Sequence, residues 1–118
     1  MRRRPGSLVP LELAILDTLV QLRRRGTPEA HGFLIASELR TLGDQRRLTA
    51  YGTLYKALDR LADSGALERH WEEPEVAAQD SRPRRRYHRI TPTGEAALAE
   101  AGGFRRVDRK AERRAAPS

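Results

Sequence analysis

The stretch RPRRRYHRI, residues 82–90, places five arginines among nine residues. A guanidinium group stays charged at any physiological pH and binds phosphate oxygens through two parallel hydrogen bonds. Residues 85–90 alternate as a β-strand does, and we expect Ile90 to face the core. The charge then gathers at the tip of a hairpin. The predicted phosphate contacts are Arg82, Arg84, Arg85 and Arg86.

Acidic residues on the outgoing side of the same hairpin suggest an alternative role for this charge. These residues are Glu72, Glu73, Glu75 and Asp80. Opposite charges that lie close together cancel much of each other's field. The stretch is therefore also typical of a solvated loop whose charge is balanced locally, and the sequence leaves both interpretations open.

A second group of polar and aromatic residues lies in TAYGTLYKALDRL, residues 49–61. Leu54, Leu58 and Leu61 recur at helical spacing and predict the buried side. The other faces carry hydroxyls that can donate to phosphates, a lysine, and a glycine that lets the backbone approach a phosphate. In a helix that enters the major groove, the N-terminal residues usually reach the base edges. The candidate contacts are Thr49, Tyr51, Gly52, Thr53, Tyr55, Lys56 and Arg60. The alternative is that the tyrosines edge the core and the threonines are only caps.

Three helices and a hairpin are needed to position these two groups. The first helix begins near Pro10, a favourable first-turn proline, and ends before Gly26. A second covers 31–42, with Phe33, Ile35, Ala36, Leu39 and Leu42 as predicted core residues. The third begins near Thr49 as N-cap and ends at Gly65. Strands follow at 66–71 and 84–91, and the segment 74–83 between them is predicted to be a loop.

This order of elements predicts a mainly α fold with a small β-hairpin, the winged helix-turn-helix. We expect a basic arm at 1–7, a DNA-binding domain at 8–91, a C-terminal helix at 92–113 and a disordered tail at 114–118. Thr91 is the predicted N-cap of the C-terminal helix, and Gly102–Gly103 is predicted to kink or end it. The arm is either a minor-groove contact or a solvated tail.

Several motifs resemble those of the PadR family of bacterial transcriptional regulators. They are HGFLIASEL (31–39), YGTLYKALDRLADSGAL (51–67), Trp71 and RRRYHRITPTGEAAL (84–98). The resemblance covers roughly residues 8–100. It implies a homodimer that binds operator DNA, usually as a repressor released by a small ligand. It also implies that the C-terminal helix supplies the dimer contact, here through Ala97, Ala101, Phe104 and Val107.

Composition narrows the classes of function. The chain has 118 residues, a net charge of +7 and a sequence pI of about 10.9, which favours a polyanionic partner such as double-stranded DNA. No apolar run reaches the ~18 residues of a membrane span, and no cysteine is present. We expect a cytoplasmic protein. No catalytic group, cofactor motif or metal-ligand spacing is recognisable, so an enzyme is not expected.

Trp71 and the basic surface each permit two interpretations. Trp71 either closes the edge of the core or stacks on a flat aromatic effector, as aromatic residues can in the resembled family. The basic surface either binds DNA in a sequence-specific way or docks on an acidic partner protein. A protein-docking module is expected to expose an apolar patch where a DNA-binding protein presents its third helix and wing.

Overall fold

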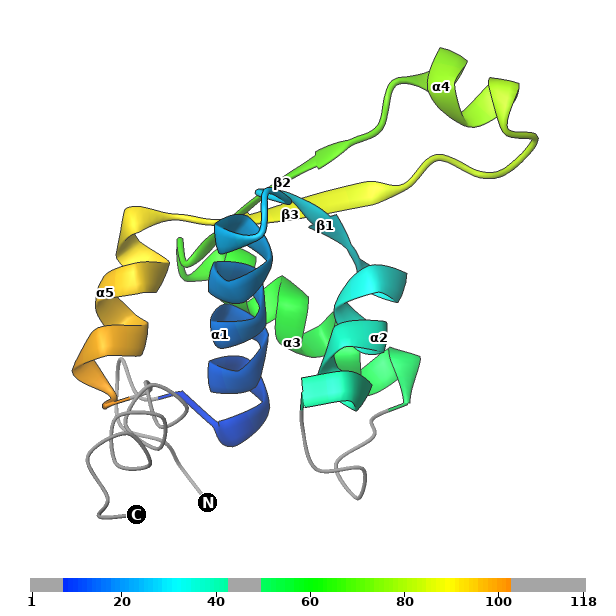
Figure 1. Cartoon of the computed structure of the whole chain (residues 1–118). Coiled ribbons are helices and arrows are strands. Elements are labelled where there is room, and N and C mark those ends of the chain that lie inside the picture. The colour runs from blue at the N-terminus through cyan, green and yellow to red at the C-terminus, as the bar shows by residue number, and fades with distance from the viewer. Residues whose placement is uncertain (1–7, 43–49, 103–118) are drawn as a thin grey trace, which may run out of the picture.

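The computed structural model describes residues 8–42 and 50–102 of the chain (Figure 1). The predicted N-terminal arm at 1–7, residues 43–49 with Thr49, and the residues from 103 onward lie outside the described residues. The C-terminal boundary predicted at 113 and the tail at 114–118 therefore stay predictions.

Five helices and three strands make up the described part. In chain order they are α1 (Pro10–Arg24), β1 (Ala30–His31), α2 (Gly32–Leu42), α3 (Tyr51–Asp63), β2 (Leu67–Trp71), α4 (Pro74–Gln79), β3 (Arg86–Ile90) and α5 (Pro92–Glu100). The fold is mainly helical with one small sheet, as the sequence predicts. Pro10 stands at the start of α1, and Gly26 follows its end with φ +95°, a value that favours glycine.

Helix α1 is the centre of the core. It packs against α2, α3 and α5, and Figure 1 shows it between α5 and α2 with the sheet across one end. Its buried residues Ile15, Leu16 and Leu19 meet Leu54 and Leu58 of α3 in one apolar cluster. Burial of each such side chain stabilises the fold by roughly 1.5–3 kcal/mol.

The sheet is antiparallel with strand order β1-β3-β2. Leu67 of β2 lies opposite Ile90 of β3, and both are buried, which confirms the predicted inward face. His88 is also buried, and its Nδ1 lies 3.3 Å from the carbonyl oxygen of Ala30. Burial lowers the pKa of His88. The residues at the base of the hairpin thus belong to the core, while its outer half projects away from the helices (Figure 1).

Four local predictions are wrong. His31 belongs to the short strand Ala30–His31 and is not the start of α2, because this strand pairs with β3. Phe33 is 59% exposed instead of buried. The segment 74–83 contains the helix α4, started by Pro74 at its first position. Helix α3 begins at Tyr51 with Ala50 as its N-cap, so Thr49 does not occupy that position.

The junction between β3 and α5 is a tight contact with the end of α3. Thr91 is the N-cap of α5, as predicted, and its hydroxyl accepts from the Gly94 amide and donates to the Gly65 carbonyl at 2.6 Å. A Cβ at Gly94 would stand 2.9 Å from Cγ1 of Ile90 and would collide with the backbone of Ala66. Only glycine allows α5 to lie this close to the strands.

Candidate nucleic-acid interface

Helix α3 separates its core residues cleanly from the predicted contact residues. Leu54, Ala57, Leu58 and Leu61 are buried. Tyr51, Gly52, Thr53, Tyr55 and Lys56 are all exposed. The structure therefore leaves the first two turns of α3 open to a partner, and the cap-only alternative does not apply to Thr53, which lies inside the helix.

The two tyrosines of α3 form a pair that leans towards α2. Their rings stack with centroids 6.3 Å apart. The ring of Tyr55 lies over Gly32, the first residue of α2, where a Cβ would stand 2.7 Å from ring atoms of the tyrosine. Tyr51 and Tyr55 are 44% and 45% exposed, so they are half-open surface residues and not part of the core edge. The sequence gives no sign of the role of Gly32.

Arg60 has a different place from the other α3 candidates. Its Nε donates to Oε2 of Glu12 at 2.7 Å, and the Glu12 side chain is only 1% exposed. An ion pair with a buried carboxylate is costly to break, because the buried carboxylate would lose this counter-charge. Arg60 therefore ties α3 to α1. Its side chain is 46% exposed, but the ion pair makes the guanidinium less available to DNA than the side chains of the first two turns.

A second ion pair connects α3 to the hairpin. Asp59 lies on the exposed side of α3, and Arg69 of β2 donates to its Oδ1 at 2.6 Å. The pair neutralises a carboxylate that would otherwise repel phosphates. It also links α3 to β2, the first strand of the hairpin formed by β2, α4 and β3, which we call the wing. No pattern in the sequence indicates this link, because the partners belong to different elements.

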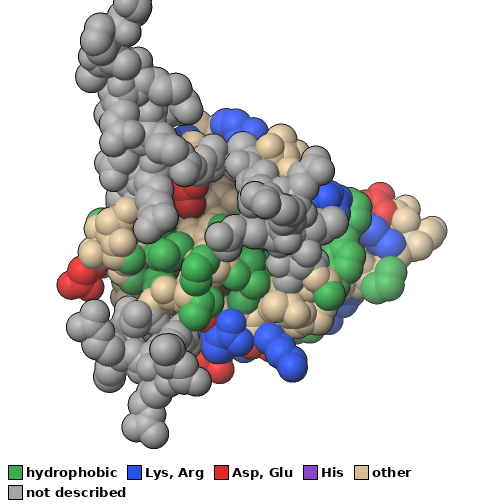
Figure 2. Space-filling view, turned by 90° about the horizontal axis from the view of Figure 1, so that it is seen from below, with side chains coloured by type: hydrophobic (Ala, Val, Ile, Leu, Met, Phe, Trp, Pro, Cys, Tyr) green, Lys and Arg blue, Asp and Glu red, His purple; other side chains and the backbone are tan. Residues whose placement is uncertain are grey.

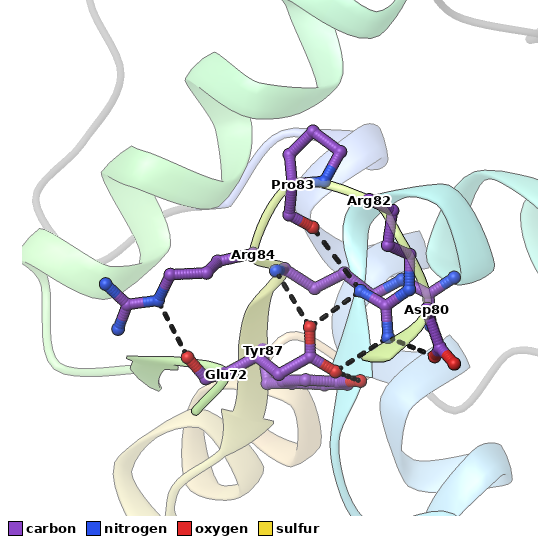
Figure 3. A network of polar contacts seen from close by, with 7 residues as sticks. Glu72, Asp80, Arg82, Pro83, Arg84 and Tyr87 are labelled. Carbon is purple, nitrogen blue, oxygen red and sulfur yellow. Dashed lines mark hydrogen bonds and ion pairs between the residues drawn. The ribbon is translucent and has the colours of Figure 1, made fainter. Parts of the chain in front are cut away.

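The tip of the wing is organised by one carboxylate, that of Glu72 (Figure 3). Arg82 donates to both of its oxygens, at 2.6 and 2.8 Å, and the Arg85 amide and the Tyr87 hydroxyl also donate to it. Arg84 donates through Nε to the Glu72 backbone carbonyl at 2.8 Å. The Glu72 side chain is 7% exposed, and its hydrogen bonds to Arg82 hold its pKa at about 2, well below the usual range.

Three of the four predicted wing arginines thus fall into two groups. Arg82 is 20% exposed and is engaged by Glu72 and Asp80, so it braces the tip. Arg84 is exposed, and its guanidinium lies over the Trp71 ring at 5.7 Å, with that of Arg86 at 4.9 Å. These distances suit cation–π contact. The interpretation that acidic residues of the hairpin balance the charge locally therefore applies to Arg82. Arg84 and Arg86 form no ion pair with any residue of 8–42 or 50–102.

Trp71 is 50% exposed at the outer end of β2. It does not close the edge of the core, which is the first of the two interpretations that the sequence allows. Its ring instead supports two arginines. On the opposite face of the sheet the rings of His70 and Tyr87 stack at 5.7 Å, and Glu29 pairs with both His70 and Arg89.

The predicted dimer contacts are only partly described. Ala97 is partly buried, Ala101 is exposed beyond the end of α5, and Gly102 has φ +63°. Helix α5 therefore ends at Glu100, next to Gly102–Gly103, where the sequence predicts that the helix kinks or ends. Phe104 and Val107 lie outside the described residues. The side chain of α5 that enters the core is Leu98, which is fully buried.

Residues 8–42 and 50–102 contain neither a candidate metal site nor a candidate membrane-spanning helix. No group of three or more His, Asp or Glu side chains there could hold a metal ion. Within the same ranges, no helix has the length and apolar character to cross a membrane.

A three-helix core with a basic antiparallel hairpin beside an exposed third helix defines a winged helix-turn-helix protein. The sequence profile of the Transcriptional regulator PadR-like family matches residues 19–100. The chain belongs to this family, whose members are transcriptional regulators and not enzymes. The comparison with curated proteins gave no match.

Solved structures share the fold over most of the chain. A transcriptional regulator from Clostridium thermocellum has 22% identity and a TM-score of 0.62, with 91% of this chain and 90% of that chain covered. A PadR family transcription regulator from hypervirulent Clostridium difficile has 19% identity and a TM-score of 0.62, with 88% and 95% covered. A PadR-like transcription factor from Bacteroides fragilis has 25% identity and a TM-score of 0.60, with 89% of each chain covered.

Proposed function

We propose that this PadR-like regulator is a repressor that binds a near-palindromic operator as a homodimer and is released by a small aromatic ligand. The observation that carries the DNA contact is the arrangement of α3 and the wing. The open first turns of α3 and the arginines on Trp71 are linked through the Arg69–Asp59 pair. In two copies, the two α3 helices would enter successive major grooves, about 10 bp apart.

The contact residues divide by what they can reach. On α3 we propose Thr49, Tyr51, Gly52, Thr53, Tyr55 and Lys56 as base and phosphate contacts. On the wing we propose Arg84, Arg85 and Arg86 as phosphate contacts, since Arg82 is held by Glu72. Arg60 contributes through the position of α3. An aromatic effector would meet Trp71 only by competing with the arginines over its ring, which offers a way to couple ligand binding to release of DNA.

A salt series with the full chain tests this proposal. Fluorescence anisotropy would compare a duplex that carries the promoter of its own gene with a scrambled duplex. We expect the promoter duplex to bind at least ~1,000-fold more tightly. Arg84→Ala combined with Arg85→Ala should weaken both complexes alike and reduce the slope of log K against log[salt] by about 1.8, or about 0.9 per phosphate.

Arg24→Ala is the matched control, because Arg24 is exposed on α1, outside α3 and the wing. It should leave the slope almost unchanged. Thr53→Ala should instead reduce the discrimination between the two duplexes. A double arginine variant with the slope of the unmodified chain would contradict the wing assignment. Absence of binding to any duplex at low salt would contradict the proposal as a whole.

Docking on an acidic partner protein remains the second candidate, and one observation favours it. Phe33, Trp71 and Val76 are large hydrophobic residues with exposures of 59%, 50% and 44%. Exposed aromatic residues are common at the centre of protein interfaces. Absence of binding to any duplex at low salt would favour this candidate, because a DNA contact made through arginines is strongest there.

A further inference from the structure

The aromatic pair on α3 is an apolar surface in an otherwise polar contact region. Tyr51 and Tyr55 stand one turn apart and are each almost half exposed. In the described ranges neither phenol hydroxyl forms a hydrogen bond. The open parts of these side chains are ring faces and edges together with hydroxyls that have no partner in the described residues, and in free protein they are in contact with water.

The position of the pair is fixed from α2. The Tyr55 ring occupies the space that a side chain at residue 32 would need, so it rests against the backbone where α2 begins. Tyr51 stacks on this ring at 27°. Such a surface loses little side-chain freedom when it binds, because one ring is already held.

The chemistry of the major groove limits what this surface can recognise. Among the groups that the base pairs present there, only the C5-methyl of thymine is apolar. The ring centroids are 6.3 Å apart, which is about two base-pair steps of ~3.4 Å. Contact with thymine methyls would remove both partners from water, whereas contact with any other base edge would leave a polar group facing a ring.

We propose that Tyr51 and Tyr55 are specificity-determining residues that select thymine methyl groups two base-pair steps apart in the operator. This inference rests on the proposed function, since it needs α3 in the major groove. It also defines what Gly32 does: its missing side chain leaves room for the Tyr55 ring in the orientation that meets the groove.

The experiment removes only the methyl group. The full chain first selects duplexes from a random-sequence pool, and thymines in the selected duplex are then replaced one at a time by deoxyuridine. Replacement at the contacted positions should weaken binding about fourfold each, as expected for one buried methyl. In Tyr55→Ala the same replacement should have no effect at one of these positions, because the ring that contacts the methyl is gone.

Three variants separate the ring from other causes. Tyr55→Phe should keep the fourfold sensitivity to uracil, because the ring remains. Gly32→Ala should lose it while the chain stays folded, since the new methyl displaces only the end of a flexible side chain. Lys56→Ala, a neighbour on the exposed side of α3, should weaken the thymine and uracil duplexes equally. Thermal unfolding followed by circular dichroism would verify that each variant is folded.

The outcomes distinguish this inference from the proposed function. If duplexes are selected but uracil binds as well as thymine at every position, the methyl contact is wrong and DNA binding stands. If Tyr55→Phe weakens both duplexes as much as Tyr55→Ala does, the hydroxyl contacts a phosphate, and the inference is likewise overturned. If no duplex is enriched, the proposed function fails together with this inference.

Discussion

The negatively charged carboxylate of Glu72 holds the positively charged wing tip in its conformation. Its carboxylate joins Arg82, the Arg85 amide and the Tyr87 hydroxyl at the wing tip. Removal of an acidic residue normally strengthens binding to DNA, because repulsion is removed with it. Here we expect Glu72→Gln to weaken binding, since the arginines would no longer be held in fixed positions. The slope of log K against log[salt] should fall by about 0.9 for each phosphate that the wing no longer binds.

Glu75→Gln is the control for this prediction. Glu75 is exposed on α4, in the same wing, and accepts no hydrogen bond from a side chain of the described residues. The substitution removes the same charge without touching the network, so binding should stay equal or become tighter. Tighter binding by both variants would mean that Glu72 acts on DNA only through its charge.

Gly52 offers a test of close approach between α3 and a phosphate. No atom of the described residues lies within 4 Å of a Cβ built at this position. Gly52→Ala should therefore leave the melting temperature unchanged or raise it, because alanine favours a helix over glycine by up to about 1 kcal/mol. We expect weaker DNA binding nonetheless. Unchanged affinity in the anisotropy assay would place the backbone at residue 52 away from the DNA.

At the scale of elements, the β3–α5 junction depends on Gly94. A methyl group there meets the Ala66 backbone and the Ile90 side chain, and neither can move without displacing β2 or β3. We expect Gly94→Ala to destabilise the fold by about 1–3 kcal/mol, the usual cost of overpacking. Urea unfolding would measure the change, with Gly52→Ala as the comparison. Equal stability of the two variants would contradict the tight junction.

The wing as an element should respond to acid separately from the helices. The pKa of Glu72 falls from 4.5 to about 2 on folding, chiefly through its hydrogen bonds with Arg82. A lowered carboxyl pKa contributes stability that is fully present above pH 4.5 and is lost as the pH falls towards 2. Trp71 is the sole tryptophan of the chain and precedes Glu72, so its fluorescence reports on the tip.

We expect the fluorescence of Trp71 to change between pH 4.5 and 2, and Glu72→Gln should abolish this transition. Circular dichroism at 222 nm would follow the helices over the same range, where the lowered pKa of Glu95 beside Arg23 also acts between α5 and α1. Fluorescence and dichroism curves that coincide in both proteins would show that the wing does not open on its own.

At the scale of the whole molecule, self-association is the property that remains to be tested. Seen from below, hydrophobic side chains gather near the centre of one face (Figure 2), and Figure 1 places the start of α1 and the end of α5 at this end. Partly buried Leu8, Leu11 and Leu13 of this region pack on the core. A dimer that covers such a surface would gain stability from burial of apolar area.

Phe104→Asp with Val107→Asp tests the proposed dimer contact. We expect this variant to sediment as a monomer and to lose joint binding to two half-sites, because a charge in an apolar interface is costly to desolvate. The winged helix-turn-helix should stay folded and show a cooperative thermal unfolding transition, since Leu98 is the last core residue of the described chain. A variant that still sediments as a dimer would place the contact elsewhere.

The spacing of apolar residues, together with the proline, glycine and threonine residues at the ends of elements, determined most of the helices and both long strands. Pro10, Gly26 and Thr91 act through their own backbone and side-chain chemistry, so their effects are local and can be predicted. The short elements could not be predicted in this way. Strand β1 exists only because β3 lies beside it, and α4 has six residues with one buried side chain, Ala77, which is too little for a periodic pattern.

The sequence by itself also determined the charge of the site and the residues on the open side of α3, because these follow from composition and helical spacing. Only the tertiary structure decided which arginines are free. Arg60 and Arg82 meet carboxylates 48 and 10 residues away, and Arg84 and Arg86 meet the Trp71 ring. A charge is a property of one residue, whereas its availability depends on what the fold places within hydrogen-bond distance of it.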